Sequence, residues 1–309
     1  MNRTALIAVD WGTTSFRAFA LSGTLSGEET IIARTQAPAG IMQVADGAFE
    51  TVLEEQLQRL DAGADVPVIM SGMITSRQGW IEVDYLPCPA GGDEIASALH
   101  RHETRAGRTV HLVAGLIDRR EPARPDVMRG EETQILGAVD ETSDRSLAVL
   151  PGTHSKWAEV GCGRILRFST YMTGELFAVL RQHSILGKLM EGDDEDEAGF
   201  EAGVRAGLAS EGGLLRDLFS VRTLPLTGAL AAGATASYLS GLLIGAEISS
   251  ARAVHRGLDA PVMLIGSDRL VARYGQALAL ASIRSERARD DAAAWGMLRI
   301  ARSCGIVGS

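Results

Sequence analysis

Residues 6–20 constrain the fold most, because they read as two strands joined by a turn of small polar residues. An apolar run ends in Asp10, the turn follows, and the second strand alternates inward and outward side chains. Gly12 lets the backbone approach a bulky anion, and the hydroxyl groups of Thr13 and Thr14 add hydrogen-bond donors. Asp10, at the end of its strand, suits a hydrated Mg²⁺. The turn therefore suggests a hairpin that grips a nucleotide phosphate, although an ordinary β-hairpin with a polar turn fits the same residues.

The second half of the chain repeats this arrangement. Residues 146–150 (SLAVL) form an apolar run, residues 151–156 (PGTHSK) form a polar turn, and residues 157–160 lead out as another strand. A phosphate-gripping hairpin that occurs once in each half is more informative than either copy alone. The sequence therefore predicts the same strand–turn–strand arrangement in both halves of the chain.

A third turn follows the apolar run at residues 261–265. Gly266 would let an adenine ring lie against the backbone, and Ser267 and Asp268 would cap the helix predicted over residues 270–281. As a motif this turn is weak when it stands alone.

A polar loop, residues 71–80 (SGMITSRQGW), follows the apolar strand predicted at residues 66–70. Open α/β sheets place their ligand contacts in such loops. Its hydroxyl groups, guanidinium and indole suit a polyhydroxylated carboxylic acid, but a surface loop with a packed Trp is an equally good interpretation. Further along, Glu131 and Glu132 open a helix that begins at or just after Gly130. They either complement the helix dipole or orient a nucleophile or a metal-bound water.

The other segments show ordinary periodicities. Strands are predicted at residues 29–35, 109–116 and 164–171, and helices at residues 49–60, 93–103, 174–182, 200–208, 214–219, 230–253 and 290–303. The small residues of the last long helix, 230–253, predict close packing against a helix or strand. The acidic run 193–197 favours a solvated loop or helix start over a metal site, and residues 183–230 match no motif.

The bulk properties narrow the class of protein. A chain of 309 residues with 46% hydrophobic residues suits two globular domains. The net charge of −9 argues against nucleic acid and anionic membranes as partners. Widely spaced Cys88, Cys162 and Cys304 predict reduced thiols and a cytoplasmic location, with Cys88 more readily a buried hydrophobe than a nucleophile. No signal peptide is expected, and the apolar stretch 238–248 is too short to span a bilayer.

The three turns in this order, with the polar loop between the first two, resemble the sugar kinase, Hsp70 and actin superfamily. Five phrases narrow the resemblance, since VDWGTTSFRAF, MSGMITSRQGW, YLPCPAG, MRGEETQILGA and LPGTHSKW together resemble the 2-dehydro-3-deoxygalactonokinase family. The resemblance implies an α/β fold of two ribonuclease H-like domains, each a mixed sheet with flanking helices, around an interdomain ATP cleft. The domains would span residues 1–140 and 141–309, with the C-terminal helix crossing back.

The same resemblance implies the reaction and its participants. The family transfers the γ-phosphate of ATP to the 6-hydroxyl of 2-dehydro-3-deoxy-D-galactonate, in galactonate and galactose catabolism. Asp10 would hold Mg²⁺ through water. The nucleotide would be bound by Gly12, Thr13, Thr14, Gly152, Thr153, His154, Ser155, Gly266 and Ser267. The sugar acid would be bound by Ser71, Met73, Thr75, Ser76, Arg77 and Trp80.

Two arginines are candidates for the charged groups of the substrates. Arg77 would pair with the substrate carboxylate, because a planar guanidinium suits that group. Arg17 is a second candidate for the carboxylate or for the transferring phosphate. The expected partners are ATP and the sugar acid, with a second copy of the chain in a homodimer as a further possibility.

One departure from the superfamily pattern bears on catalysis. Many members carry an acid in the strand before the second turn, where this chain has Leu-Pro at residues 150–151. The catalytic carboxylate must then come from elsewhere, and Glu131 resembles the acid at the first interdomain helix of phosphatase and acetate-kinase relatives. Glu132 and Asp84 are the next candidates. Lys156 would stabilise the transferring phosphoryl group or form a salt bridge at the rim.

Two other functions stay open at this point. A phosphohydrolase or acid kinase of the same superfamily, similar to exopolyphosphatases, would lack a sugar-acid pocket, so residues 71–80 argue against it. A non-enzymatic nucleotide switch of the actin or Hsp70 kind would need an added peptide-binding or filament-forming segment, and no spare domain is expected here. ADP release that depends on the sugar acid distinguishes the kinase from both.

Overall fold

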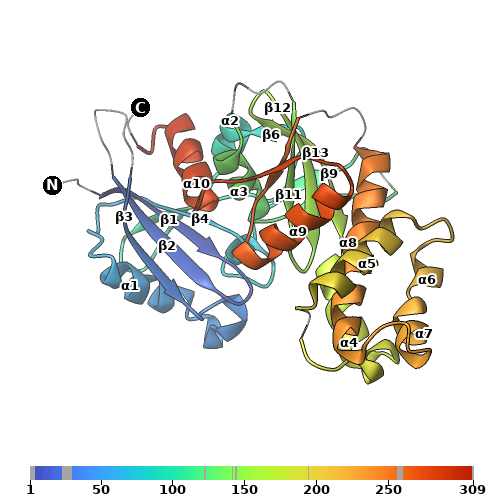
Figure 1. The fold of residues 1–309 in the computed structure, drawn as a ribbon. Coiled ribbons are helices and arrows are strands. Elements are labelled where there is room, and N and C mark those ends of the chain that lie inside the picture. The colour runs from blue at the N-terminus through green and yellow to red at the C-terminus, as the bar shows by residue number, and fades with distance from the viewer. Residues whose placement is uncertain are drawn as a thin grey trace. The chain divides into compact units, whose positions relative to one another are not determined.

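The computed structural model describes residues 4–22, 30–121, 123–140, 142, 145–193, 195–255 and 260–307. Glu29 of the predicted third strand and Asp194 of the acidic run lie outside these residues. The chain forms two compact units (Figure 1). Unit 1 comprises Met1–Asp144, Val160–Arg167 and Arg289–Ser309, and unit 2 comprises Arg145–Glu159 and Phe168–Ala288.

Unit 1 is built on a mixed sheet in the strand order β3-β2-β1-β4-β8-β7. Strands β1, β2 and β3 are antiparallel neighbours, β4 and β8 run parallel to β1, and β7 is antiparallel to β8. Their bounds are Thr4–Trp11 (β1), Phe16–Ser22 (β2), Ile31–Ala37 (β3), Val68–Ser71 (β4), His100–Glu103 (β7) and Thr109–Leu112 (β8). The central strands are apolar and buried, as expected for a sheet that is covered on both faces.

Helices cover this sheet. Helix α1 (Phe49–Arg59) places Leu53 and Leu57 in one apolar cluster with Ile7 of β1. Helix α10 (Ala292–Ser303), from the end of the chain, contacts β1 and β4 and packs against two further helices. These two are α2 (Gly92–Ser97) and α3 (Glu131–Ala138). A small sheet in the order β10-β9-β5 has the bounds Asp126–Met128, Leu116–Asp118 and Leu86–Pro87.

A second mixed sheet has the strand order β15-β14-β11-β12-β13-β6. The bounds are Ala90–Gly91 (β6), Ser146–Leu150 (β11), Ser155–Gly161 (β12), Arg164–Tyr171 (β13), Val262–Leu264 (β14) and Ser285–Arg287 (β15). β14 is parallel to both β11 and β15, while β6 pairs with the part of β13 that belongs to unit 1. In both sheets the first strand of the hairpin, β1 or β11, lies between the second strand of the hairpin and a later strand that is parallel to it, β4 or β14, so the predicted repeat of the hairpin is confirmed.

The helices of unit 2 follow β13. They are α4 (Thr173–His183), α5 (Glu197–Leu208), α6 (Leu214–Asp217), α7 (Ser220–Leu226), α8 (Thr235–Val254) and α9 (Asp268–Leu280). Helices α5 and α8 lie side by side. A Cβ atom at Gly241 of α8 would lie 2.1 Å from the Phe200 carbonyl oxygen of α5, so only glycine permits this approach. The close packing predicted from the small residues of this segment is confirmed.

The predicted fold class, α/β with mixed sheets and flanking helices, is confirmed. The predicted helix over residues 93–103 is wrong in its second half, because α2 ends at Ser97 and residues 100–103 form β7. Pairing with β8 decides this conformation, and a local periodicity contains no information about that partner. The predicted strand over residues 109–116 is divided between β8 and β9, which belong to different sheets. Among the residues described, no helix has both the length and the apolar character needed to cross a bilayer.

Candidate active site

The ends of two neighbouring strands bring Asp10 and Ser71 together in unit 1. Strands β1 and β4 are parallel, and Asp10 lies opposite Ser71 in their register. Asp10 is 8% exposed, and its carboxylate forms an ion pair with Arg17, which lies opposite it on β2. Open α/β sheets bind their ligands at the carboxyl ends of the strands. Three residues predicted for the site therefore share one edge of this sheet.

The turn after β1 is braced by the segment that follows β3. The carbonyl groups of Gly12 and Thr13 accept hydrogen bonds from the backbone N–H groups of residues 41 and 42, at 3.0 and 3.2 Å. The side chains of Thr13 and Thr14 are exposed. A fixed backbone with exposed hydroxyl groups is suited to bind a phosphate.

Glu132 joins the end of β4 to the start of α3. Its Oε1 accepts a hydrogen bond from the Ser71 hydroxyl at 3.1 Å, and its Oε2 accepts one from the Gly130 N–H at 2.7 Å. The side chain is completely buried. Burial, and next the neighbouring Glu131 carboxylate, raise the pKa of Glu132 from its ordinary value of 4.5 to about 8, against the opposing effect of its hydrogen bonds. Glu132 is thus mostly protonated at neutral pH.

Glu131 has a different environment from its neighbour. It is half-buried, and its Oε2 accepts a hydrogen bond from the Arg129 N–H at 2.9 Å. The first turn of α3 places its carboxylate where the helix dipole favours negative charge. Of the two adjacent acids, Glu131 is the one with a solvent-accessible side chain.

The loop predicted to bind the sugar acid contains both buried and exposed side chains. Thr75 is buried, and Trp80 is half-buried with its ring edge-on to His102, 5.2 Å between centroids. The Ser76 hydroxyl donates to the Met73 carbonyl oxygen at 2.7 Å. Arg77 is exposed. Arg77 is therefore the charged side chain that this loop presents to solvent.

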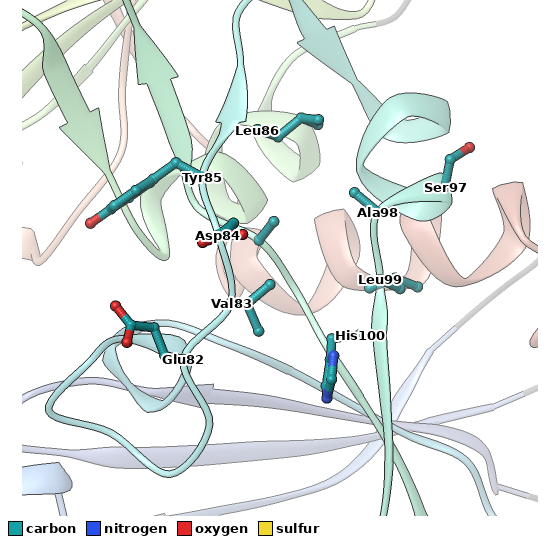
Figure 2. A pocket seen from close by; sticks show the side chains of 10 residues that line it. Glu82, Val83, Asp84, Tyr85, Leu86, Ser97, Ala98, Leu99 and His100 are labelled. Atoms are coloured by element: carbon teal, nitrogen blue, oxygen red, sulfur yellow. The ribbon is translucent and has the colours of Figure 1, made fainter.

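Asp84, a reserve candidate for the base, lines a separate cavity of 570 Å³ in unit 1 (Figure 2). Glu82, Ser97 and His100 also line it. Neither Ser71 nor the two acids of α3 are among its lining residues. The structure therefore does not group Asp84 with Ser71.

In unit 2, some of the residues that were predicted to bind the nucleotide at the turn between β11 and β12 are exposed to solvent, and others are buried. Thr153 and His154 are exposed, and the His154 ring pairs with Glu175 of α4. Ser155 and Lys156 are buried, and the Lys156 ammonium donates to the Thr170 hydroxyl of β13 at 2.8 Å.

The start of α4 lies directly against this turn. The Glu175 N–H donates to the Thr153 carbonyl oxygen at 3.0 Å. A Cβ atom at Gly174 would lie 2.4 Å from the Gly152 carbonyl oxygen, so the approach depends on glycine at this position. The turn and a helix N-terminus, with its favourable dipole for anions, are therefore held together.

A cavity of 190 Å³ opens beside this turn. Backbone of Gly152, the polar side chains of Thr173 and Tyr274, and apolar side chains of Phe177 and Leu243 contribute to its lining. A mainly apolar cavity with a few polar groups is typical of sites for small organic ligands.

The third predicted turn lies at the same edge of the unit 2 sheet. β14 and β11 are parallel neighbours, and a Cβ atom at Gly266 would lie 3.6 Å from the Pro151 carbonyl oxygen. Ser267 occupies the N-cap position of α9, but its side chain makes no capping hydrogen bond. The Asp268 carboxylate pairs with Arg287 of β15. The expected capping by the Ser267 side chain is therefore wrong, and the two turns lie next to each other.

Comparison with known proteins identifies the family. The family model described as 2-keto-3-deoxy-galactonokinase matches residues 10–300. The chain belongs to this family.

Individual relatives agree with this assignment. The chain is 39% identical over 276 residues to the protein of Rhizobium meliloti (strain 1021) assigned as 2-dehydro-3-deoxygalactonokinase DgoK1, with 88% of each chain covered. It is 35% identical over 271 residues to the 2-dehydro-3-deoxygalactonokinase of Escherichia coli (strain K12), again with 88% of each chain covered. A crystal structure of a Sinorhizobium meliloti protein, assigned as a 2-dehydro-3-deoxygalactonokinase, has a TM-score of 0.87 and 35% identity. That alignment covers 97% of this chain and 99% of the other.

Arg129, inside the region matched by the family model, was missed by sequence reasoning. Its guanidinium donates to the carbonyl and hydroxyl oxygens of Thr75, both at 2.7 Å, and to the Val83 carbonyl oxygen at 2.8 Å. It also lies 4.3 Å from the centroid of the Tyr85 ring. Arg129 thus fixes the loop that carries Arg77. The signal was its position in the phrase MRGEET, directly before the two acids.

Asp10 is the candidate ligand for Mg²⁺. In the part of the chain that the structure describes, no three His, Cys, Asp or Glu side chains gather into a metal site. Mg²⁺ at phosphoryl-transfer sites commonly takes one or two carboxylates, while substrate phosphates and water complete its shell. A single carboxylate at the end of β1, next to the Gly12–Thr14 turn, fits that requirement.

Proposed function

We propose that this protein transfers the γ-phosphoryl group of ATP to the 6-hydroxyl of 2-dehydro-3-deoxy-D-galactonate. The observation that carries the proposal is the family match over residues 10–300, together with two relatives named for this kinase activity. The clustered residues at the sheet edges of both units support it, because unit 1 offers groups that suit the sugar acid and a phosphate, and unit 2 offers groups that suit a nucleotide.

Unit 2 is assigned the nucleotide. Backbone N–H groups of the Gly152–Ser155 turn and of the start of α4 are assigned to phosphate oxygens, apart from the Glu175 N–H, which donates to the Thr153 carbonyl oxygen. The cavity beside the turn offers Phe177 and Leu243 to the nucleoside, with Gly266 at the neighbouring turn. These features explain how an acidic chain can bind an anion through local donors.

Unit 1 is assigned the sugar acid. The exposed guanidinium of Arg77 pairs with the carboxylate, since a planar fork of donors matches its two oxygens. The indole of Trp80 offers an apolar face to the carbon chain. Thr75 and Ser71 are buried and act by shaping the loop.

Glu131 is assigned as the group that accepts the proton of the attacking hydroxyl. Its carboxylate is accessible and stands at the start of α3, whereas the Glu132 carboxylate is buried and engaged by Ser71 and Gly130. Phosphoryl transfer depends mainly on alignment and charge stabilisation, and the base takes the proton late in the step. Asp10 would hold Mg²⁺, which neutralises phosphate charge when bound.

The cellular setting is also a proposal. Free thiols at Cys88, Cys162 and Cys304 support a reducing, cytoplasmic compartment. A homodimer stays a possibility, which light scattering on the purified protein would test.

Coupled ADP release tests the proposed reaction. The protein is given ATP and Mg²⁺ with 2-dehydro-3-deoxy-D-galactonate, with its gluconate epimer, or with water alone. Turnover that requires the galactonate acid supports the proposal. Equal rates with both epimers would indicate a sugar-acid kinase of broader specificity. ADP release that neither acid increases above the rate with water alone would contradict the kinase assignment.

A further inference from the structure

We propose that Glu247, buried in α8, is a positioning residue that holds the nucleotide-binding elements of unit 2 in place. The inference rests on the proposed assignment of the nucleotide to unit 2. Glu247 is 3% exposed, so its carboxylate cannot itself touch a ligand of ordinary size in the cavity. It acts through the residues that it binds.

The carboxylate accepts hydrogen bonds from a hydroxyl and an indole on one oxygen and from two hydroxyls on the other. Oε1 receives the Ser155 hydroxyl and the Trp157 indole N–H, both at 2.7 Å. Oε2 receives the Tyr274 hydroxyl at 2.7 Å and also the Thr173 hydroxyl. Both oxygens therefore have two donors each.

These donors come from the elements assigned to the nucleotide. Ser155 closes the turn between β11 and β12. Thr173 is the first residue of α4, and Tyr274 lies in α9. Thr173 and Tyr274 also line the 190 Å³ cavity. Glu247 thus connects the turn, the helix N-terminus and one wall of the cavity through a single carboxylate.

No neutral side chain can accept all four of these hydrogen bonds. An indole N–H can only donate, and the hydroxyls point their hydrogens at the carboxylate, so the site requires an acceptor with two oxygens. A glutamine has one acceptor oxygen, and its NH₂ group would have to donate to two of the hydroxyls, so those two hydrogen bonds would reverse direction. Glu247→Gln therefore keeps the side-chain volume but removes the negative charge and reverses two of the four hydrogen bonds.

The cost of a buried carboxylate supports a specific role. Burial raises the pKa of Glu247, and the hydrogen bonds from Thr173, Trp157, Ser155 and Tyr274 oppose this shift by stabilising the charged form. An apolar residue would fill the same space without such a cost. The buried Glu247 carboxylate is therefore explained better by the positions in which it holds its four partners than by a gain in stability.

Glu159 supplies a matched control. It is also a fully buried glutamate of unit 2, and its carboxylate binds His255 Nδ1 at 2.8 Å and pairs with Arg145. Neither of these partners lines the 190 Å³ cavity. Glu159→Gln should disturb the folded state to a comparable degree without displacing the nucleotide-binding elements.

The test compares Glu247→Gln and Glu159→Gln with the parent protein. ADP binding is measured by calorimetry without sugar acid, and KM is measured separately for ATP and for the sugar acid. We expect Glu247→Gln to weaken ADP binding and raise the KM for ATP at least tenfold, with the KM for the sugar acid changed less than twofold. Glu159→Gln should leave all three within twofold.

Tyr274→Phe keeps the test decisive if Glu247→Gln does not fold, because it removes one hydroxyl and leaves the ring. We expect it to weaken ADP binding about threefold. Two results would overturn the proposal: a folded Glu247→Gln protein with the ADP affinity of the parent, or an equal loss of ADP affinity in Glu159→Gln. If Glu247→Gln does not fold, parental ADP affinity in Tyr274→Phe would overturn the proposal instead. A parent protein that binds neither ADP nor ATP would instead refute the proposed function.

Discussion

The Ser71 hydroxyl donates to Glu132 Oε1 across 3.1 Å, although 61 residues separate the two in sequence. This bond ties the end of β4 to the start of α3, so the loop after β4 and the accessible Glu131 have a fixed relation within unit 1. The Glu132 side chain is buried, and the adjacent Glu131 side chain is half-buried.

Glu132→Gln should change how stability depends on pH. The folded pKa of about 8 lies above the ordinary value of 4.5, so the folded protein retains a proton that the unfolded chain releases. Below a pH equal to the ordinary pKa, Glu132 makes its full contribution to the free energy of unfolding. That contribution falls as the pH rises towards the folded pKa, and above the folded pKa it no longer changes. Glutamine cannot ionise, so the variant should gain stability relative to the parent between about pH 5 and about pH 9. Urea unfolding at both pH values measures the free energy of unfolding of the variant and of the parent. A difference between the two proteins that does not change with pH would contradict the raised pKa.

Glu131→Gln should lower kcat by roughly 10²–10⁴-fold, because the proton of the attacking hydroxyl loses its acceptor. The KM values should change little, since the amide keeps the volume of the side chain. Steady-state kinetics with ATP and the sugar acid give both constants. Glu121→Gln, at an exposed acid paired with Arg124, is the control. A kcat for Glu131→Gln within threefold of the parent would remove Glu131 as the base.

Arg77→Ala should raise the KM for the sugar acid by roughly 10–100-fold, because a charge-assisted hydrogen-bond pair is lost. Lysine at this position should recover part of the affinity, since it keeps the charge without the planar fork. The KM for ATP should not change. Arg124→Ala serves as the control, because its side chain is 83% exposed and pairs only with the neighbouring Glu121 among the contacts described. Unchanged kinetics in Arg77→Ala would place the substrate carboxylate elsewhere.

Arg129→Met should destabilise the protein by about 2–4 kcal/mol, because buried oxygens of Thr75 and Val83 lose their donor. The released loop should also bind the sugar acid more weakly. Denaturant unfolding and the KM for the sugar acid provide the two measurements. Stability within about 0.5 kcal/mol of the parent would contradict the bracing role, since that is the range of ordinary surface substitutions.

Gly174→Ala should raise the KM for ATP several-fold, because the new Cβ would lie 2.4 Å from the Gly152 carbonyl oxygen. Overpacking of this kind costs about 1–3 kcal/mol in stability. Gly233→Ala is a matched control, since the nearest atom to its Cβ would be 3.9 Å away. Equal effects of the two substitutions would argue against a tight contact between α4 and the turn.

Local pattern was sufficient for several elements of the fold. The hairpins at β1–β2 and β11–β12 were predicted because an apolar run, a polar turn and another run fit within a short window. The helix over residues 49–60 was predicted for the same reason, since its apolar spacing depends only on its own residues. The strand β7 was not, because its conformation depends on β8.

By itself, the sequence determined the places of the hairpin turns, the polar loop after β4 and the family. Each of these depends on short runs of consecutive residues, so it can be recognised without knowing how the chain folds. The tertiary structure alone decided which polar groups are buried together. Glu247 meets Ser155 across 92 residues, and Arg129 meets Thr75 across 54. A lone acid in the apolar stretch from Tyr238 to Ile248 was a signal, but its partners could not be named from sequence. A buried polar group takes its role from the donors that surround it, and folding is what brings those donors together.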